Sequence, residues 1–590
     1  MTVQCRLMEL REEMCRRGLD AYLVPSADPH HSEYLADHWQ ARRWLSGFTG
    51  TAGTLVVTAS EAGLWTDGRY FIQAEEQLAG SGISLFKLDH SGVPNWPEWL
   101  GQSLPPGGRV GFDGRTVTVA EADGLLAQGL LLDTREDLLD GIWHGRPALP
   151  DAPAFDHDIR YAGLGFAEKL AHLRRQLSQH GADYQLLCAL DDIAWLFNIR
   201  GTDVDYSPVV HAYALIGTRD VWLFIDAQKV PEVLRQRFQE DGIQLGSYDG
   251  CAEVLSQLEK GAVLRLDPAV VNIALFECLP KQVSVQRGVE LTTAMKAVKN
   301  PVELQHFREC LRQDGVAMVR FMRWLDQLVP AGEVSELSAE AFLETERKAI
   351  SGYQGPSFRT IAGYKEHGAK MHYAADADSN YRVGQQSFFL VDSGGHYLNG
   401  TTDITRTFHF GPLTKQQQID YTLVLKAHIA LSRARFRKGC RGTQIDALAR
   451  APLWEQGIDY GCGTGHGVGF CLNVHEGPHS LSQKWIDEPL EVGMTVTVEP
   501  GIYREGEYGI RIENILTVVE DQTTEFGTFY RFETLTLAPI CTRALLPDLL
   551  SAQELAWLND YHGEVYQALA SALTQEEREW LSASTVAVGV

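Results

Sequence analysis

The sequence predicts a multidomain protein of the α/β (α+β) class, in which two copies of one α/β domain precede a larger C-terminal domain. The chain has 590 residues, which exceeds what a single hydrophobic core normally serves. A pattern of amphipathic helix, glycine and apolar strand occurs twice in its first half. In its second half, capped helices alternate with pairs of β-prone segments, which is typical of a mixed α and β fold.

The internal repeat predicts the first two domains. In each copy, three apolar residues at helical spacing precede a glycine, Gly18 or Gly181, and then an apolar run, 21–24 or 184–187. Each copy then alternates strand and helix patterns, which indicates an α/β domain. The helical positions are Leu7, Leu10 and Met14 in the first copy and Leu170, Leu173 and Leu177 in the second.

The domain boundaries follow from the ends of these patterns. A stretch that carries proline and aspartate, 146–156, separates the two copies and is the expected linker. Asn300, Pro301 and Glu303 supply an N-cap, a first-turn proline and an acidic third position, so a long helix is expected to begin there and run toward Val329. The expected domains are residues 1–154, 155–294 and 295–590.

Composition excludes several classes of partner. The formal net charge is −25 and no basic block offsets it, which argues against binding to nucleic acid or to an anionic membrane. The ten cysteines lack paired spacing and fit reduced thiols better than a disulfide framework. The N-terminus has no apolar signal core, and no apolar run is long enough to span a membrane. We therefore expect a cytoplasmic protein.

Five residues of the third domain form a candidate metal site. The apolar run 388–391 and the turn residues 393–395 place Asp392 at the end of a strand that enters a hairpin, with Asp403 on the returning arm. The segments 494–499 and 509–518 read as a second strand pair. The five candidate ligands are Asp392, Asp403, His466, Glu499 and Glu513.

The chemistry of these residues favours a pair of divalent cations. Acidic residues in turns and a histidine among glycines are commonly structural when taken singly. Glu499, between Val498 and Pro500 at the end of an apolar strand, is costly to bury without a cation. Four carboxylates and one imidazole suit Mn²⁺, Co²⁺ or Zn²⁺, and carboxylates can bridge two ions.

The motifs around these residues carry a family resemblance. VDSG, GTTDITRT, GTGHGVG, LNVHEGP, EPGIY and GIRIEN closely resemble the motifs of the X-prolyl aminopeptidase (aminopeptidase P) family of metallopeptidases, in its long three-domain form. The resemblance extends to the YRFETLTLAPI and WLNDYH segments near the C-terminus. It implies two creatinase-N-like α/β domains followed by a pita-bread catalytic domain.

The resemblance also implies a role for each site residue. Asp392 would bind one metal, His466 and Glu499 the other, and Asp403 with Glu513 would bridge them. Glu499 would also carry a proton from the attacking water to the leaving nitrogen. Three further residues are implied, His372 and His475 as catalytic residues that stabilise the tetrahedral intermediate, and Arg511 as a partner of the carboxylates.

The implied function is release of the N-terminal residue from peptides with proline at the second position, through a metal-bridging hydroxide. Two Mn²⁺ ions are expected, with Co²⁺ or Zn²⁺ as alternatives, and a homodimer built through the catalytic domain. A prolidase that cuts only Xaa-Pro dipeptides, a metal-free creatinase-like hydrolase and a catalytically inactive pita-bread binding module are the alternatives. One position departs from the pattern, because many relatives have a histidine in HGTGHG where this chain has Cys462.

Overall fold

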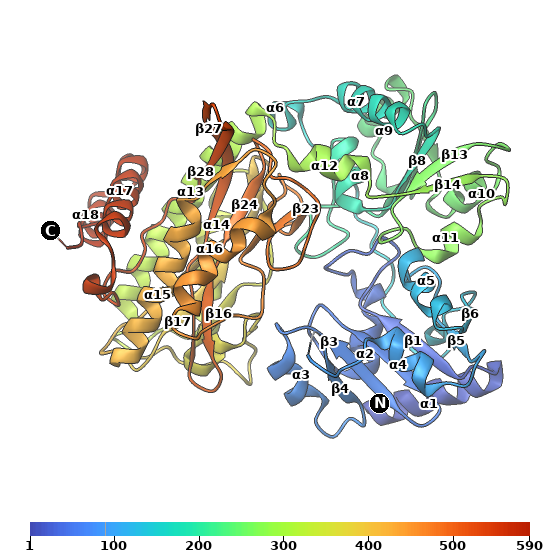
Figure 1. Ribbon diagram of the computed structural model, residues 1–590, viewed down its shortest axis with the longest axis horizontal. Helices are drawn as coiled ribbons and strands as arrows, with labels where there is room; N and C mark the ends of the chain where they lie inside the picture. The colour runs from blue at the N-terminus through green and yellow to red at the C-terminus, as the bar shows by residue number, and fades with distance from the viewer. Residues whose placement is uncertain (89, 590) are drawn as a thin grey trace. The chain divides into compact units, whose positions relative to one another are not determined.

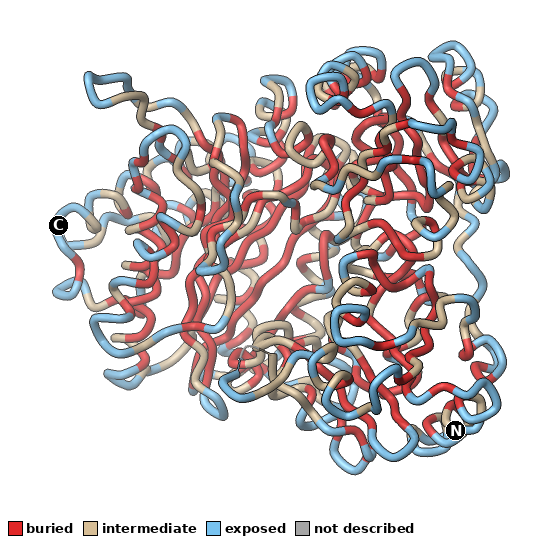
Figure 2. The backbone as a smooth tube through the Cα atoms, turned by 45° about the vertical axis from the view of Figure 1, so that its right-hand side comes forward, coloured by how far each residue is buried: buried red, intermediate tan, exposed pale blue. Residues whose placement is uncertain are grey.

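The computed structural model describes residues 1–88 and 90–589, which form two compact units (Figure 1). The first unit comprises residues 1–159 and 164–293, and the second comprises residues 160–163 and 294–590. Within each unit, buried residues follow the strands, and exposed residues follow the outer helices and loops (Figure 2). The division of the first unit after residue 154 stays a prediction.

Two six-stranded sheets of the first unit have the same strand order, β4-β3-β2-β1-β5-β6 and β12-β11-β10-β8-β13-β14. Corresponding strands also pair in the same sense, as β1 is antiparallel to β2 and parallel to β5, and β8 is antiparallel to β10 and parallel to β13. The sequence repeat therefore reflects a structural repeat. The strands are β1 (Ala21–Pro25), β2 (Thr54–Thr58), β3 (Ala62–Thr66), β4 (Ser84–Lys87), β5 (Arg109–Gly111) and β6 (Leu131–Asp133), then β8 (Tyr184–Leu187), β10 (Ala212–Gly217), β11 (Val221–Ile225), β12 (Gln244–Gly246), β13 (Val263–Leu266) and β14 (Ser284–Arg287).

The helix that opens each copy has the predicted buried face. In α1 (Val3–Arg17) the three predicted apolar residues are buried, and the same holds for α7 (Phe166–Gln179). The chain leaves α1 through Gly18, whose φ of +65° is a left-handed conformation that glycine adopts without strain. Gly181 has a φ of +66° after α7. The predicted pattern of helix, glycine and strand is confirmed in both copies.

The two copies share one apolar cluster, and the first copy has a second cluster of its own around Leu7, Leu10 and Met14 of α1. A single cluster of buried side chains includes Leu23 and Val110 from the first copy and Leu186 and Leu264 from the second. The N-terminal ends of α5 (Val119–Ala127) and α11 (Ile273–Glu277) also pair, because the Val119 N–H donates to the Val271 carbonyl (3.0 Å) and the Ile273 N–H donates to the Val117 carbonyl (2.9 Å). Removal of either copy would expose apolar surface of the other.

The second unit begins with the predicted long helix. Asn300 caps α13 (Pro301–Leu328), and Glu303 completes a capping box by accepting from the Asn300 backbone N–H. Helix α15 (Lys415–Ser432) packs against α16 and several strands. The remaining long helices are α14 (Glu336–Lys348), α16 (Gly442–Trp454), α17 (Ala552–Leu569) and α18 (Gln575–Ser584).

The strands of the second unit form small sheets whose ends carry the candidate ligands. One sheet has the order β16-β17-β20 and another the order β21-β28-β27-β24, and shorter pairs join β22 to β23 and β25 to β26. The strands are β16 (Ile361–Tyr364), β17 (Phe389–Ser393), β20 (Ile404–Phe408), β21 (Arg435–Arg437), β22 (Gly465–Gly467), β23 (Glu476–Leu481), β24 (Thr495–Val498), β25 (Gly501–Arg504), β26 (Tyr508–Arg511), β27 (Asn514–Thr524) and β28 (Gly527–Thr534). A third sheet contains β15 (Tyr353–Pro356), β18 (Gly395–Tyr397) and β19 (Gly400–Thr401).

One strand prediction is wrong in an informative way. The segment 509–518 is not one strand, because β26 ends at Arg511 and β27 begins at Asn514. The chain changes partner at this point, since β26 pairs with β25 and β27 pairs with β24. The Glu513 N–H donates to the Thr405 carbonyl instead (3.1 Å). Glu513 therefore belongs to neither strand pair, and its backbone is hydrogen-bonded to β20 instead.

The described residues contain neither a membrane-spanning helix nor a disulfide. None of the helices formed by residues 1–88 and 90–589 is both long enough and apolar enough to cross a membrane. All ten cysteines fall within these ranges, and none is in a disulfide.

Candidate metal centre

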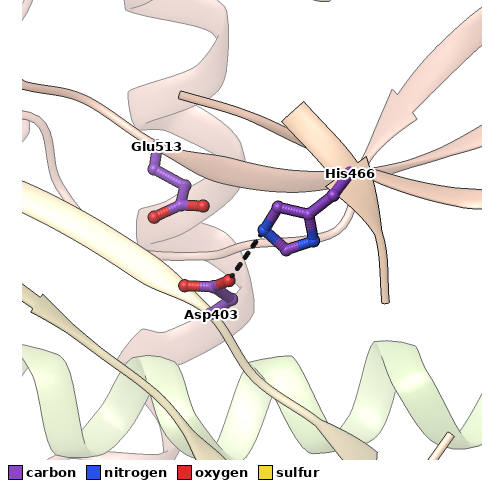
Figure 3. Close-up of side chains that lie close together, drawn as sticks. All are labelled: Asp403, His466 and Glu513. Carbon is purple, nitrogen blue, oxygen red and sulfur yellow. Dashed lines mark ion pairs between the residues drawn. The ribbon is translucent and has the colours of Figure 1, made fainter. Parts of the chain in front are cut away.

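Three of the other four predicted ligands lie around His466. Its Nε2 atom is 3.5 Å from Asp403 Oδ2 and 3.4 Å from Glu499 Oε1. One ligand atom from each of Asp403, His466 and Glu513 lies within 4.8 Å of the other two, and the three side chains point toward a common space (Figure 3). Side chains that are far apart in the sequence therefore meet at one point.

Strand register explains why the carboxylates meet. Asp392 in β17 pairs with Thr405 in β20, so Asp403, which directly precedes β20, lies near Asp392. Val498 pairs with Asn514 where β24 and β27 meet, and this places Glu499 beside Glu513. The Thr405 hydroxyl then donates to Glu513 Oε2 (2.7 Å), which joins the two strand pairs.

The orientation of His466 is fixed by its own neighbours. Its backbone N–H donates to Thr497 Oγ1 (3.1 Å), and its ring Nδ1 lies 2.8 Å from the Gly467 carbonyl oxygen. When Nδ1 of an imidazole ring donates its hydrogen to a carbonyl, the lone pair of Nε2 is available to bind a metal ion. Metal-binding histidines commonly have this arrangement. In this protein Nε2 faces Asp403 and Glu499.

Asp392 is held by Arg511, whose Nη2 atom lies 2.6 Å from Asp392 Oδ2. The other guanidinium donors reach the Thr405 hydroxyl from Nε (3.1 Å) and the Tyr503 hydroxyl from Nη1 (2.6 Å). Arg511 is 3% exposed, so these contacts replace water. It therefore orients Asp392 and Thr405 together.

The pKa shifts of the clustered side chains indicate a site that binds cations. Burial and the neighbouring carboxylates Asp403 and Glu499 raise the pKa of Asp392 to about 7, although Arg511 opposes them. Burial, followed by the same carboxylates, raises the pKa of Glu513 well above its usual range. Burial alone would lower the pKa of His466, but Asp403 and Glu499 raise it to about 9. The pKa shifts of Asp392 and Glu513 are those of buried carboxylates that repel one another, and the shift of His466 reflects its attraction to the same negative charge.

The donor atoms fit a pair of divalent metals. Asp392 Oδ1 and Glu513 Oε1 are buried and have no hydrogen-bond partner among the described residues. Buried polar atoms of this kind normally have a partner, and a cation would supply it. Hard carboxylate oxygens with one imidazole nitrogen are ligands for Mn²⁺, Co²⁺ and Zn²⁺.

A pH-dependent stability follows for the metal-free protein. The pKa of Asp392 is about 7 in the fold and 3.8 in the unfolded chain, so between these values the folded state binds more protons. The contribution of Asp392 to stability is thus present below pH 4 and is lost as pH rises toward 7. The loss is on the order of 4 kcal/mol at most. Added metal should reverse it by binding the ionised form.

Thermal unfolding of chelated protein at pH 5 and pH 7 measures this effect. Asp392→Asn is the control, because it removes the titration and should make the change between the two pH values less destabilising. An identical change in the wild type and in Asp392→Asn would contradict the prediction.

The three remaining predicted site residues lie at different distances from this cluster. Arg511 contacts Asp392 directly. The ring of His475 meets the ring of His466 edge to face, with centroids 4.3 Å apart. His372 follows Met371, whose carbonyl oxygen lies 3.5 Å from Arg511 Nη2, so its backbone reaches the same region. The catalytic roles of His372 and His475 stay predictions.

Sequence reasoning missed the residue that joins the ligand segments to the C-terminal helix. Arg406 is 1% exposed, and its guanidinium donates to the carbonyl of Glu513 (2.6 Å) and to the side chain of Asn514 (2.8 Å). It also donates to Ala538 and Pro539 carbonyls (both 2.9 Å) and to the hydroxyl of Tyr561 in α17 (3.0 Å). Its place in TTDITRTF, three residues after Asp403, was the available signal.

Family models match four consecutive stretches of the chain. The description Creatinase/Prolidase N-terminal domain matches residues 6–136 and 145–303. The metallopeptidase family M24 matches residues 305–520, and the C-terminal region of peptidase M24 matches residues 528–588. With the buried carboxylate cluster, these matches define an M24 metallopeptidase that has two creatinase-type N-terminal domains and a pita-bread catalytic domain, as predicted.

Relatives match over nearly the whole length. The probable Xaa-Pro aminopeptidase P of Coprinopsis cinerea is 38% identical over 611 residues, which cover 99% of this chain and 98% of the relative. Aminopeptidase P2 of Arabidopsis thaliana is 39% identical over 606 residues, which cover 96% and 85%. A crystal structure of X-prolyl aminopeptidase from Caenorhabditis elegans, described as a cytosolic enzyme with a di-nuclear active site, matches with a TM-score of 0.96, 34% identity and 100% coverage of both chains. The chain belongs to the aminopeptidase P family.

Proposed function

We propose that the protein is a dinuclear Xaa-Pro aminopeptidase, which releases the N-terminal residue from peptides with proline at the second position. The convergence of Asp403, His466, Glu499 and Glu513, with Asp392 held beside them by Arg511, is the observation that carries this proposal. The names of the full-length relatives support the substrate class. The absence of an N–H on a proline nitrogen explains why such bonds need a dedicated enzyme.

Each residue of the centre has a proposed task. Asp392 would hold one cation, His466 and Glu499 would hold the second, and Asp403 with Glu513 would contribute ligands to both. When bound, the two cations supply the Lewis acidity that peptide hydrolysis needs. Glu499 accepts the proton of the attacking water and returns it to the leaving nitrogen. His475 and His372 donate hydrogen bonds to the substrate carbonyl oxygen as it gains negative charge.

Hydrolysis of two peptides by protein with a measured metal content tests the proposal. We expect two metal ions per chain and cleavage of an Xaa-Pro-Xaa peptide as well as of an Xaa-Pro dipeptide. Cleavage of the dipeptide alone would favour the prolidase alternative. Neither metal nor cleavage would indicate a binding module.

The metal, the compartment and the assembly are further parts of the proposal. Mn²⁺ is the proposed ion, because the donor set is dominated by carboxylate oxygen. A cytoplasmic location is proposed because the described cysteines form no disulfides and the solved relative from Caenorhabditis elegans is described as cytosolic. A homodimer is proposed from the family resemblance alone. Peptides that begin Xaa-Pro are the proposed partners, and the charge of −25 argues against nucleic acid and anionic membranes.

Cys462 offers a test of specificity that leaves the ligands intact. Its carbonyl accepts from Arg450 Nη2 (2.7 Å), and its side chain packs, like that of Tyr503, against the apolar cluster that contains Ile502. We expect Cys462→Ser to keep metal content and most activity. Cys462→His should alter the preference for proline over alanine after the scissile bond more than it alters metal affinity, by the roughly 0.5–1.5 kcal/mol of one neutral hydrogen bond.

Turnover and metal content of both Cys462 variants, on peptides with proline or alanine at the second position, check this prediction. Loss of metal from Cys462→Ser would show that the thiol is a ligand and that the set of five is incomplete.

A further inference from the structure

A second buried charge cluster lies beside His475. Glu476, the residue that follows His475, begins β23 and faces two lysines that precede α13. Lys299 Nζ contacts Glu476 Oε1, and Lys296 Nζ lies 3.4 Å from Glu476 Oε2. The three side chains are between 0% and 2% exposed. Charged groups buried this fully are retained only when they are paired closely.

The hydrogen bonds of this cluster account for every donor of Lys299. Besides Glu476, its ammonium group donates to the carbonyls of Lys296 and Ala297, each at 3.2 Å. An ammonium group has three N–H donors, so all three are used. Each oxygen of Glu476 in turn faces one lysine. The backbone between α12 (Leu291–Ala297) and α13 is thereby held to Glu476 from two sides.

Glu476 is joined to the metal centre through backbone pairing. It pairs with Gly467, the residue after His466, where β22 meets β23. A Cβ atom on Gly467 would lie 2.3 Å from the Glu476 carbonyl oxygen, so the two strands approach closely. On the other side, the His475 ring packs edge-on against the His466 ring. A displacement of Glu476 would therefore move His475 relative to His466.

We propose that Glu476, held by Lys296 and Lys299, is a positioning residue that fixes the His475 ring beside the metal centre. This inference rests on the proposed function, in which His475 contacts the substrate. It predicts that the segment before α13 affects turnover and not metal affinity, because the lysines hold Glu476, which directly follows His475 and is not one of the five ligands.

Glu476→Gln in the full-length, metal-loaded enzyme tests this role. We expect kcat on an Xaa-Pro-Xaa peptide to fall about tenfold to a hundredfold, the cost of a misplaced catalytic group. KM should change by less than about threefold, since the loss falls on the transition state. Metal content should remain two ions per chain.

Further variants distinguish loss of positioning from general damage to the fold. Lys299→Met should lower kcat as Glu476→Gln does, and the double variant should lose no more than the worse single one, because the residues act as a unit. Lys299→Arg, which keeps the charge, should retain more of kcat. Lys229→Met is the matched control, since it removes a buried lysine from Asp203 (2.6 Å) in the first unit and should leave kcat near the wild-type value.

A crystal structure of Glu476→Gln gives a readout that does not depend on activity. The His475 ring should shift by more than about 1 Å relative to His466, a displacement large enough to affect catalysis. An unmoved ring with kcat within about twofold of the wild type overturns the inference. If the wild type fails to cleave Xaa-Pro peptides, the proposed function fails, and the ring position still decides whether Glu476 fixes His475. If Glu476→Gln does not fold, Lys296→Met takes its place in both measurements.

Discussion

Asp403→Ala is expected to lower kcat/KM on an Xaa-Pro-Xaa peptide by more than about a hundredfold, because changes to groups that merely support metal ligands already cost about 10–100-fold. The loss should exceed that of His466→Ala at a moderate metal concentration. A bridging carboxylate serves both cations, whereas the imidazole serves one. Asp403 also lies 3.5 Å from His466, so its removal takes away a charge that holds the ring.

Turnover and metal content should be measured together over a range of metal concentrations. We expect Asp403→Ala to retain fewer than two ions and to recover less activity than His466→Ala when metal is added. Asp326→Ala is the control, since that carboxylate pairs with Arg543 at the surface of the same unit. Near-normal turnover and metal content in Asp403→Ala would refute the dinuclear assignment.

Arg511→Met is expected to reduce both stability and activity. It leaves Asp392 buried without its partner, and breaking a buried ion pair from one side typically costs about 3–5 kcal/mol. Activity should fall about 10–100-fold, because Asp392 and Thr405 lose the group that orients them. Arg511→Lys should recover little, since an ammonium group cannot reach Asp392, Thr405 and Tyr503 in one plane.

A variant of the same hairpin separates the two effects of Arg511→Met. Arg504 pairs with Asp420 and is one-third exposed, so Arg504→Met removes an arginine from β25 without touching the carboxylate cluster. We expect it to keep near-wild-type kcat and metal content. If Arg504→Met and Arg511→Met lose activity equally, the damage comes from the hairpin and not from the orientation of Asp392.

Local pattern predicted the parts of the site that depend on neighbours in the sequence. The apolar run before Asp392 gave strand β17, and Asn300 with Glu303 gave the start of α13. The turn predicted at 393–395 is wrong, because β18 begins at Gly395 and the turn lies at Leu398 and Asn399. The break before Asn514 was not predicted, although the alternation of polar and apolar residues is interrupted there by the consecutive polar residues Glu513 and Asn514. It arises from a change of strand partner, which only the assembled sheet decides.

Contacts between residues far apart in the sequence could not be predicted either. Nothing near Lys299 in the sequence indicates a partner 177 residues away, and a buried lysine has no periodic signature. The shared core of the two N-terminal copies was missed for the same reason. The repeat predicted two similar domains, but repetition does not tell whether two apolar faces cover each other.

The contacts of Arg406 bear on the order in which this protein matures during synthesis. Its acceptors at Ala538, Pro539 and Tyr561 follow all five ligands in the sequence, so the ribosome adds them last. Until they emerge, Arg406 lacks half of the groups that hold it against the Glu513 carbonyl. Domains of a nascent chain fold as units, N-terminal first. Incomplete chains should therefore carry a folded first unit without a completed metal centre.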